Sequence, residues 1–301
     1  MKHFLSISDI DNDQIARLID IAIELKAGRV LQSLAGKSVA LLFDKPSLRT
    51  RMSFEIGIQH LGGHSIYLGR EEIGMGVREP VEDIARVVSR YADAIVVRTF
   101  AQEIVETLAR YSSIPVINAL TDDEHPCQAL ADILTVYEKK GTFKGTKITY
   151  VGDSNNVAAS LAIATVSVGA NIALASPSGY ELPQKVIDEC RARGSRSGGT
   201  IYLTSDPEEA CKDTDVIYTD VWVSMGQEAE SNQRHKVFEP YRIDTHILSL
   251  AADSVVFMHP LPAHPGEEIA EGLLDLPQSV VFDQAENRLH AQKAVLSEIM
   301  R

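Results

Sequence analysis

Short apolar runs and amphipathic stretches alternate along most of the chain. Apolar residues at helical spacing predict an opening helix over 8–27. The apolar runs that follow predict strands over 38–43, 64–68, 93–98 and 115–118. The amphipathic stretches predict helices over 51–61, 81–91, 102–110 and 126–140. An alternation of strands and helices is typical of βαβ units, so a parallel sheet is expected.

The alternation restarts after the turn-rich segment 141–145. Strands are predicted over 147–151, 171–175, 200–204, 216–218 and 255–258, and helices over 157–168, 182–193, 207–212 and 286–300. The polar stretch 224–236 has few apolar residues and is interpreted as a mobile loop. The sequence therefore predicts an α/β protein with two doubly wound parallel-sheet domains, 1–140 and 145–285. A ligand cleft is expected between them, beyond the carboxyl ends of the strands.

Composition supports this picture and narrows the partners. The 301 residues suit two domains of ordinary size, and 45% hydrophobic residues suffice for two cores. The formal net charge of −13 disfavours nucleic acid and anionic membrane surfaces as partners. A small anion would need a locally basic pocket. Three scattered cysteines fit neither a disulfide framework nor a metal-binding pair, and no leader or membrane span is apparent, so a reducing cytoplasm is expected.

Candidate chemistry lies in the turns that follow the predicted strands. The segment 47–50, Ser-Leu-Arg-Thr, links a strand to a helix. Its backbone N–H groups, hydroxyls and guanidinium suit an anion such as phosphate. Arg98 ends another strand, while His125 and Gln128 share one face at a helix start. Each of these features also has a purely structural alternative. The segment 47–50 could be a helix cap followed by surface arginines, Arg98 a solvated strand end and His125 a packed histidine.

The second half offers groups that suit an amino acid. Asp220 ends a predicted strand and can pair with an ammonium group, while the backbone N–H groups of Ser224 and Met225 can hold a carboxylate. Two prolines fix the backbone of 259–262, His-Pro-Leu-Pro, whose carbonyls can accept bonds from an amide. A cis bond is possible before the second proline. The alternative is a loop packed over the chain's single Trp222.

These segments, taken in order, resemble the aspartate/ornithine carbamoyltransferase family over essentially the whole chain. The matches are Ser47-Leu48-Arg49-Thr50-Arg51, Arg98, His125-Pro126-Cys127-Gln128, Asn156, Asp220, Ser224-Met225-Gly226, His259-Pro260-Leu261-Pro262 and Arg288. The spacing Asp-x-x-x-Ser-Met-Gly is similar to the ornithine branch. The resemblance implies transfer of the carbamoyl group of carbamoyl phosphate to the δ-amine of L-ornithine, which gives L-citrulline and phosphate in arginine biosynthesis.

The resemblance also implies an architecture. Residues 1–140, with a C-terminal helix 286–301 that packs back on them, would bind carbamoyl phosphate, and residues 145–285 would bind ornithine. A cytoplasmic homotrimer, or a multiple of trimers, with sites at subunit interfaces is implied, and no cofactor or metal is.

Residue roles follow from the same resemblance. The carbamoyl phosphate group would be Ser47, Leu48, Arg49, Thr50, Arg98, His125, Gln128, Pro260, Leu261 and Arg288. The ornithine group would be Asn156, Asp220, Ser224 and Met225. The catalytic group would be Arg49, Thr50, Arg98 and His125, of which the last three would donate to the carbonyl oxygen as it becomes an oxyanion.

The chain departs from the family at three positions. Leu48 stands where Thr is usual, Pro260 where the ornithine enzymes usually have Cys, and Gly74 where a Gln commonly contacts a neighbouring subunit's site. The Cys chemistry and the Gln contact are therefore open.

Several other functions remain alternatives. Aspartate, acetylornithine or putrescine could be the acceptor, or the chain could bind ligand without turnover. Asp220 would repel the second carboxylate of aspartate, acetylornithine lacks the α-ammonium and putrescine lacks the carboxylate. A nicotinamide oxidoreductase is disfavoured because 152–154, Gly-Asp-Ser, lacks the G-x-G-x-x-G pattern.

Overall fold

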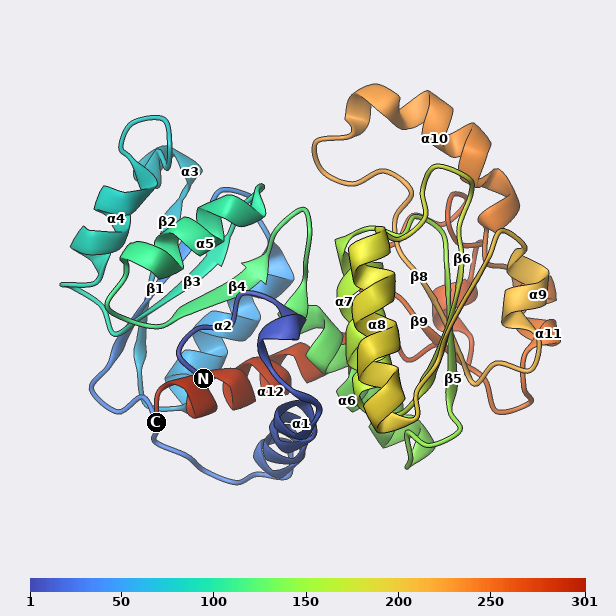
Figure 1. Cartoon of the computed structure of the whole chain (residues 1–301), viewed down its shortest axis with the longest axis horizontal. Helices are drawn as coiled ribbons and strands as arrows, with labels where there is room; N and C mark the ends of the chain where they lie inside the picture. Colours follow the sequence, from blue (N-terminus) through green and yellow to red (C-terminus); the bar gives the residue numbers. More distant parts are fainter. The chain divides into compact units, whose positions relative to one another are not determined.

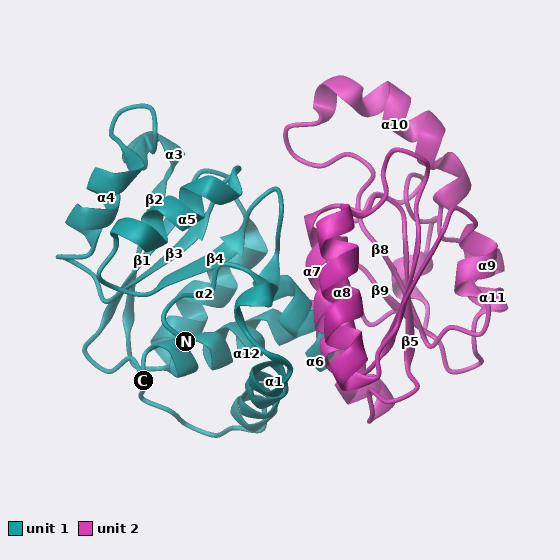
Figure 2. Cartoon of the chain, in the orientation of Figure 1, with its two compact units in different colours: residues 1–134, 286–301 teal, residues 135–285 magenta.

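The computed structural model describes residues 1–301, which form two compact units (Figure 2). Unit 1 comprises Met1–Leu134 and Glu286–Arg301, and unit 2 comprises Thr135–Ala285. The division falls within α6 (Pro126–Lys140), before the turn-rich segment 141–145. The final helix, α12 (Val281–Ile299), starts in unit 2 and belongs to unit 1 from Glu286 onward. The C-terminal helix therefore does return to the N-terminal unit.

Unit 1 is built on a four-stranded parallel sheet with the order β2-β1-β3-β4 (Figure 1). The strands are β1 (Ser38–Phe43), β2 (His64–Gly69), β3 (Ala94–Arg98) and β4 (Val116–Leu120). The helices wholly within the unit are α1 (Asn12–Lys26), α2 (Leu48–His60), α3 (Arg70–Ile73), α4 (Val81–Val88) and α5 (Gln102–Tyr111), with a short η1 (Ile7–Asp9) before them. β1 and β3 end side by side, with Phe43 in register with Arg98.

The two faces of this sheet are covered by different helices. Ala40 and Leu42 of β1 pack into a buried cluster with Ile84 of α4 and Leu108 of α5. On α2, the position of Gly57 lies against α12, where an added Cβ would come 3.3 Å from a side-chain carbon of Lys293. The alternation of side chains along a strand thus gives β1 two buried faces, as its continuous apolar run predicts.

Unit 2 holds a five-stranded parallel sheet with the order β7-β6-β5-β8-β9. The strands are β5 (Lys147–Val151), β6 (Asn171–Ala175), β7 (Ile201–Thr204), β8 (Val216–Thr219) and β9 (Val256–Met258). The helices are α7 (Asn156–Ser167), α8 (Gln184–Ser197), α9 (Pro207–Cys211), α10 (Ser231–Phe238) and α11 (Thr245–Leu250), with short turns η2 (Glu228–Glu230), η3 (Glu239–Tyr241) and η4 (Leu273–Asp275). Figure 1 shows α7 and α8 on one face of the sheet and α9 and α11 on the other.

The prediction of two α/β domains with parallel sheets is confirmed, and every predicted strand is present with all pairings parallel. The interpretation of 224–236 as a mobile loop is wrong from residue 228 onward, because η2 and α10 occupy that part. The closing helix begins at Val281 and not at residue 286. α3 and α11 were missed, since helices of four and six residues leave little periodicity to detect. No helix combines the length and the hydropathy that a membrane crossing requires.

Candidate functional site

The turn between β1 and α2 is shaped as an anion site. Ser47 is the N-cap of α2: its Oγ accepts a hydrogen bond from the Thr50 N–H at 3.3 Å and donates one to Thr50 Oγ1 at 2.9 Å. Leu48, the first helical residue, is 70% exposed, whereas Thr50 is buried. Arg49 between them is half-buried. The N–H groups of the first helical turn and the dipole of this 13-residue helix favour a negative charge here.

Two buried arginines from distant parts of the chain converge on Thr50. Arg98, the last residue of β3, places Nη1 3.5 Å from Thr50 Oγ1. Arg288 of α12 donates from Nη2 to the same hydroxyl oxygen at 2.8 Å and from Nη1 to Gln128 Oε1 at 2.9 Å. The Nε of Arg98 is buried without a hydrogen-bond partner. Unit 1 thus gathers guanidinium groups around one hydroxyl, in a place where their charges lack water to solvate them.

This concentration of positive charge shifts the titration of its members. Burial, followed by the positive charges of Arg288 and Arg49, lowers the pKa of Arg98 to about 9. Burial also lowers the pKa of the Arg49 guanidinium. Like charges gathered in a buried site repel one another, so an anion bound among them would relieve that repulsion. The arrangement therefore favours an anionic ligand.

His125 and Gln128 complete the group in unit 1. Burial, followed by the charges of Arg288 and Arg98, holds the pKa of His125 well below its usual value, so the imidazole is neutral near pH 7. Gln128 donates from Nε2 to Asp132 Oδ1 at 2.8 Å, which fixes the orientation of its amide. Its Oε1 already accepts from Arg288 and keeps a second lone pair for a ligand N–H.

Cys127, between them in sequence, is a packed thiol. Its Sγ lies 3.5 Å from the Asn118 carbonyl oxygen, and burial raises the pKa of the thiol to about 12. A thiol with that pKa is not a nucleophile at neutral pH.

In unit 2, Asp220 follows β8 and is buried. Its Oδ1 accepts from the Val221 N–H at 2.8 Å, and its Oδ2 accepts from Asn155 Nδ2 at 2.9 Å. Burial raises the pKa of Asp220 despite these bonds, so the carboxylate lacks a full counter-charge. Asn155 also caps α7, one of the two roles that the sequence allows for the asparagines of this turn, and Asn156 is the first residue of that helix. A ligand ammonium group beside Asp220 would supply the missing positive charge.

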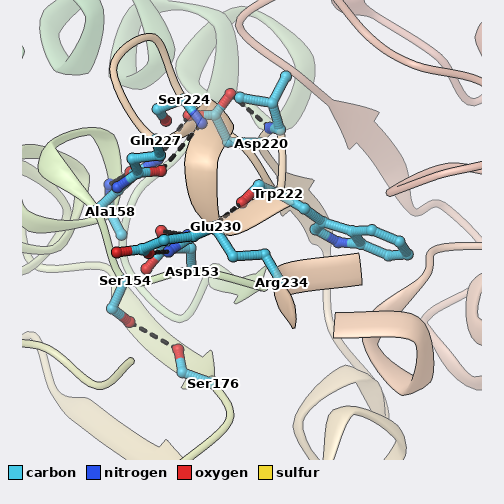
Figure 3. A network of polar contacts seen from close by, with 12 residues as sticks. Asp153, Ser154, Ala158, Ser176, Asp220, Trp222, Ser224, Gln227, Glu230 and Arg234 are labelled. Carbon is cyan, nitrogen blue, oxygen red and sulfur yellow. Dashed lines mark hydrogen bonds and ion pairs between the residues drawn. The ribbon is translucent and has the colours of Figure 1, made fainter. Parts of the chain in front are cut away.

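Arg234 of α10 anchors the segment after Asp220 through a hydrogen bond to its backbone, as Figure 3 shows. Arg234 Nε donates to the Trp222 carbonyl oxygen at 2.5 Å, and its Nη2 forms a buried ion pair with Asp153, in the turn after β5. Sequence reasoning missed this residue. Arg234 and Phe238 of α10 and Tyr241 of η3 are spaced by four and three residues and are all buried, and this helical spacing is the signal in the sequence.

The Ser224–Gly226 turn uses its N–H groups internally. Ser224 N–H donates to Gln227 Oε1 at 3.0 Å, and Gly226 N–H donates to both oxygens of Glu228 at 3.0 Å. Met225 is 48% exposed. The Ser224 N–H that the sequence assigned to a ligand carboxylate is therefore occupied by a side-chain oxygen, which the ligand would replace.

The 259–262 segment follows β9. Pro260 is buried and Leu261 is half-buried, with φ at 58° and a cis bond to Pro262, as the two prolines suggested. The Leu261 N–H donates to His259 Nδ1 at 2.9 Å, which holds the left-handed backbone at this residue.

The loop at Gly74 has a conformation that does not suit the glutamine common at this position in the family. Gly74 ends α3 with φ at +59°, and a Cβ added there would come 2.6 Å from the Cβ of Arg78. A glutamine side chain at this position would therefore require a different loop conformation.

The predicted residues fall into two groups. The first is gathered in unit 1: Ser47, Leu48, Arg49, Thr50, Arg98, His125, Gln128 and Arg288. The second lies in unit 2, in the segments that follow β5, β8 and β9: Asn156, Asp220, Ser224, Met225, Pro260 and Leu261. The cleft between the domains stays a prediction.

Two parallel α/β units, one with an arginine-rich anion site and one with a buried, partly compensated carboxylate, define a protein built to hold an anion and an amine. Comparison with known families is specific. Residues 2–138 match the carbamoyl-P binding domain of aspartate/ornithine carbamoyltransferase, and residues 144–299 match its Asp/Orn binding domain. The chain belongs to the aspartate/ornithine carbamoyltransferase family.

Individual relatives agree with this assignment. Ornithine carbamoyltransferase of Anoxybacillus flavithermus is 50% identical over 303 residues, which cover 99% of this chain and 96% of the relative. Anabolic ornithine carbamoyltransferase of Pyrococcus furiosus is 49% identical, again over 99% and 96%. A solved structure of ornithine carbamoyltransferase from Pyrococcus furiosus superposes with a TM-score of 0.95 over 99% of this chain and 97% of that one.

Proposed function

We propose that this chain is an ornithine carbamoyltransferase, which moves the carbamoyl group of carbamoyl phosphate to the δ-amine of L-ornithine. The products are L-citrulline and phosphate, as in arginine biosynthesis. The observation that carries the proposal is the convergence of Arg98 and Arg288 on Thr50 at the N-terminus of α2. A buried cluster of guanidinium groups at a helix N-terminus suits the phosphate group of an acyl phosphate, and the full-length relatives of about 50% identity bear the same name.

Unit 1 would bind carbamoyl phosphate. Ser47, the Leu48 N–H, Arg49 and Thr50 hold the phosphate group at the start of α2, and Arg98 adds a further charge. Gln128 and Arg288 lie beside the carbamoyl amide, where the free lone pair of Gln128 Oε1 accepts one of its N–H groups. The carbonyls of Pro260 and Leu261 accept the other.

Catalysis would rest on fixed positive charge. The lone pair of the deprotonated δ-amine attacks the carbonyl carbon, and the carbonyl π electrons move to oxygen. These electrons then re-form the carbonyl as the C–O bond to phosphate breaks, and the departing phosphate takes the proton that the attacking nitrogen loses. Thr50, Arg98 and the neutral imidazole of His125 donate to the oxygen as its charge grows. Because their positions are set before the reaction, little reorganisation accompanies the transition state.

Unit 2 would bind the amino acid. The buried carboxylate of Asp220 pairs with the α-ammonium, while Asn156, Ser224 and the Met225 backbone hold the rest of the α-amino acid end. Ornithine provides the ammonium that Asp220 lacks. Aspartate would bring a second carboxylate, which Asp220 repels.

The first test is an Arg49→Ala variant assayed for citrulline at low carbamoyl phosphate. Loss of a charged contact to phosphate should lower kcat/KM by about 10-fold or more. Arg51→Ala is the matched control, because Arg51 lies on the same helix and pairs with Glu55 at 3.0 Å. Near-normal turnover by Arg49→Ala would overturn the phosphate assignment. A panel of ornithine, acetylornithine, putrescine and aspartate identifies the acceptor.

We also propose that the chain works as a homotrimer or a multiple of trimers, in the cytoplasm. Leu48 and Met52 of α2 are 70% and 50% exposed, and Ile66 on the edge strand β2 is 51% exposed, which supports a subunit contact on unit 1. The three buried cysteines carry no disulfide, which suits a reducing compartment. Light scattering should give three times the chain mass of 33.0 kDa or a multiple of that value, and fractionation of the source cells should place the chain in the cytoplasm.

A further inference from the structure

A cluster of ionisable side chains lies outside the residues assigned to the reaction, in the loop that follows β9. The side chains of His264, Glu267 and Glu268 place one potential ligand atom each within 4.8 Å of one another. His264 is exposed and Glu267 is half-buried, whereas Glu268 has an exposed fraction of 0%. Imidazole nitrogen and carboxylate oxygen are ligands that zinc and similar transition metals accept.

Only one of the two carboxylate oxygens of Glu268 accepts hydrogen bonds. Its Oε1 accepts from the His264 N–H at 2.6 Å and bonds to His259 Nε2 at 3.1 Å. The Leu261 N–H donates to His259 Nδ1, so the ring proton of His259 is on Nε2 and points at Glu268. The other oxygen, Oε2, is buried and accepts no hydrogen bond, and the nearest cationic partner is His264 Nδ1 at 3.6 Å.

An ionised carboxylate with one buried, unsatisfied oxygen is costly unless a cation meets it. Hydrogen bonds from His259 Nε2 and the His264 N–H stabilise the ionised form of the Glu268 carboxylate. Oε2 is held in place because the other oxygen, Oε1, accepts two hydrogen bonds. Carboxylates that bind a metal are oriented in the same way by hydrogen bonds from neighbouring groups. Because ligands of one zinc ion lie about 3.3 Å apart, the side chains of His264 and Glu267 would have to rotate to bring their ligand atoms closer together.

A second histidine stands next to the cluster. His235 of α10 places Nε2 3.0 Å from Glu267 Oε2, and its Nδ1 lies 2.7 Å from the Ser231 carbonyl oxygen. With Nδ1–H donating to that carbonyl, Nε2–H donates to Glu267, and this proton would have to leave for Nε2 to bind a metal, in the orientation found in zinc-binding histidines. His235 of α10 thus contacts Glu267 but lies outside the three residues whose potential ligand atoms are all within 4.8 Å of one another.

We propose that His264, Glu267 and Glu268, with His235 as the fourth ligand, form a binding site for a divalent transition metal such as Zn²⁺. The site is separate from the residues assigned to carbamoyl transfer and does not depend on that proposal. An ion there would bridge α10, whose Arg234 anchors the turn after Asp220, to the loop that carries Pro260 and Leu261. Mixed nitrogen and oxygen donors favour zinc over Mg²⁺, which prefers oxygen donors and retains water.

The test is titration of the metal-free full chain with Zn²⁺ in competition with a chromophoric chelator, in the presence of excess Mg²⁺. We expect one Zn²⁺ per chain. His264→Ala and Glu267→Gln should each weaken binding by about 10-fold or more, and His235→Ala should weaken it as well. These residues are partly exposed, so the variants should fold, and melting curves without metal check this.

The matched control is His246→Ala, since His246 is exposed and lies 3.3 Å from Glu208 elsewhere in unit 2. Its affinity for Zn²⁺ should equal that of the unmodified chain. The buried cysteines do not compete as ligands. Equal Zn²⁺ affinity in the His264 and Glu267 variants, or an equal loss in the His246 control, would overturn the proposal. Citrulline synthesis by the metal-free chain is a separate readout, so failure of either proposal is recognised on its own.

Discussion

Arg288 Nη2 donates to Thr50 Oγ1 at 2.8 Å, across 238 residues of sequence. The same guanidinium holds Gln128 Oε1 at 2.9 Å through its other terminal nitrogen. One planar side chain from the last helix therefore fixes two side chains of the proposed carbamoyl phosphate site. Residues 286–301 therefore pack with unit 1 and also contribute a side chain to its proposed site.

This double contact predicts that lysine cannot replace Arg288. A lysine ammonium is a single point charge and cannot occupy both planar N–H positions. We expect Arg288→Lys to raise the KM for carbamoyl phosphate by about 10-fold or more, the size of one lost charged hydrogen bond. Citrulline formation at saturating ornithine measures it. Arg17→Lys is the control, because Arg17 is 54% exposed and pairs with Glu298 of the same helix; an equal KM in the two variants would contradict the role.

The Ser224 turn predicts a gain of affinity. Ser224 N–H donates to Gln227 Oε1, and the proposed α-carboxylate of ornithine has to replace that acceptor. Removal of the internal acceptor in Gln227→Ala should lower the KM for ornithine by about 2-fold to 10-fold, because one neutral hydrogen bond no longer competes. The control is Gln233→Ala, an exposed position on α10. An increase of the ornithine KM in Gln227→Ala would show that Gln227 supports the bound turn instead.

The buried Arg234–Asp153 pair predicts a loss of stability. Arg234→Met leaves the Asp153 carboxylate without its counter-charge in a site where burial already raises the pKa of that carboxyl. We expect the free energy of unfolding to fall by about 3 kcal/mol in urea denaturation. The added change Asp153→Asn should restore most of it, since the uncompensated charge is gone. The exposed pair Arg191–Asp188 is the control: Arg191→Met should change stability by less than about 0.5 kcal/mol.

Much of the proposed site in unit 1 was predictable, because all of its residues except Arg288 stand where a strand meets a helix. Thr50 follows β1, Arg98 ends β3 and His125 opens α6, and parallel strands bring such turns to one edge. The pairing of Arg288 with Thr50 was not predictable in this way. It depends on how the last helix packs, which no local pattern encodes.

In unit 2, more of the proposed site depends on contacts between residues that are distant in the sequence. Arg234 lies in a polar stretch whose composition suggests a loop, yet it is buried because Asp153 and the Trp222 carbonyl receive its N–H groups. A buried charge is stable only with a partner, and the partner here is 81 residues away. The asparagines of the turn after β5 were expected to cap a helix or hold a polar ligand, but the bond of Asn155 to Asp220, 65 residues away, has no local signal.

The last prediction concerns acid stability. Burial and the nearby arginines hold the pKa of His125 well below 6.5, the value expected when the chain is unfolded. Between these two pKa values the unfolded chain binds a proton that the folded chain does not, so stability falls as pH decreases below about 6.5, by up to about 1.4 kcal/mol per pH unit.

His125→Gln removes this contribution to the pH dependence of stability. Urea denaturation at about pH 7.5 and about pH 5.5 should therefore show a smaller acid-induced loss in His125→Gln, by about 1.4 kcal/mol. The difference between the two pH values is unaffected by any general destabilisation from the substitution. His60→Gln, at an exposed position of α2, should keep the full loss. If His125→Gln loses as much stability on acidification as the unmodified chain, the histidine is not neutral in the fold.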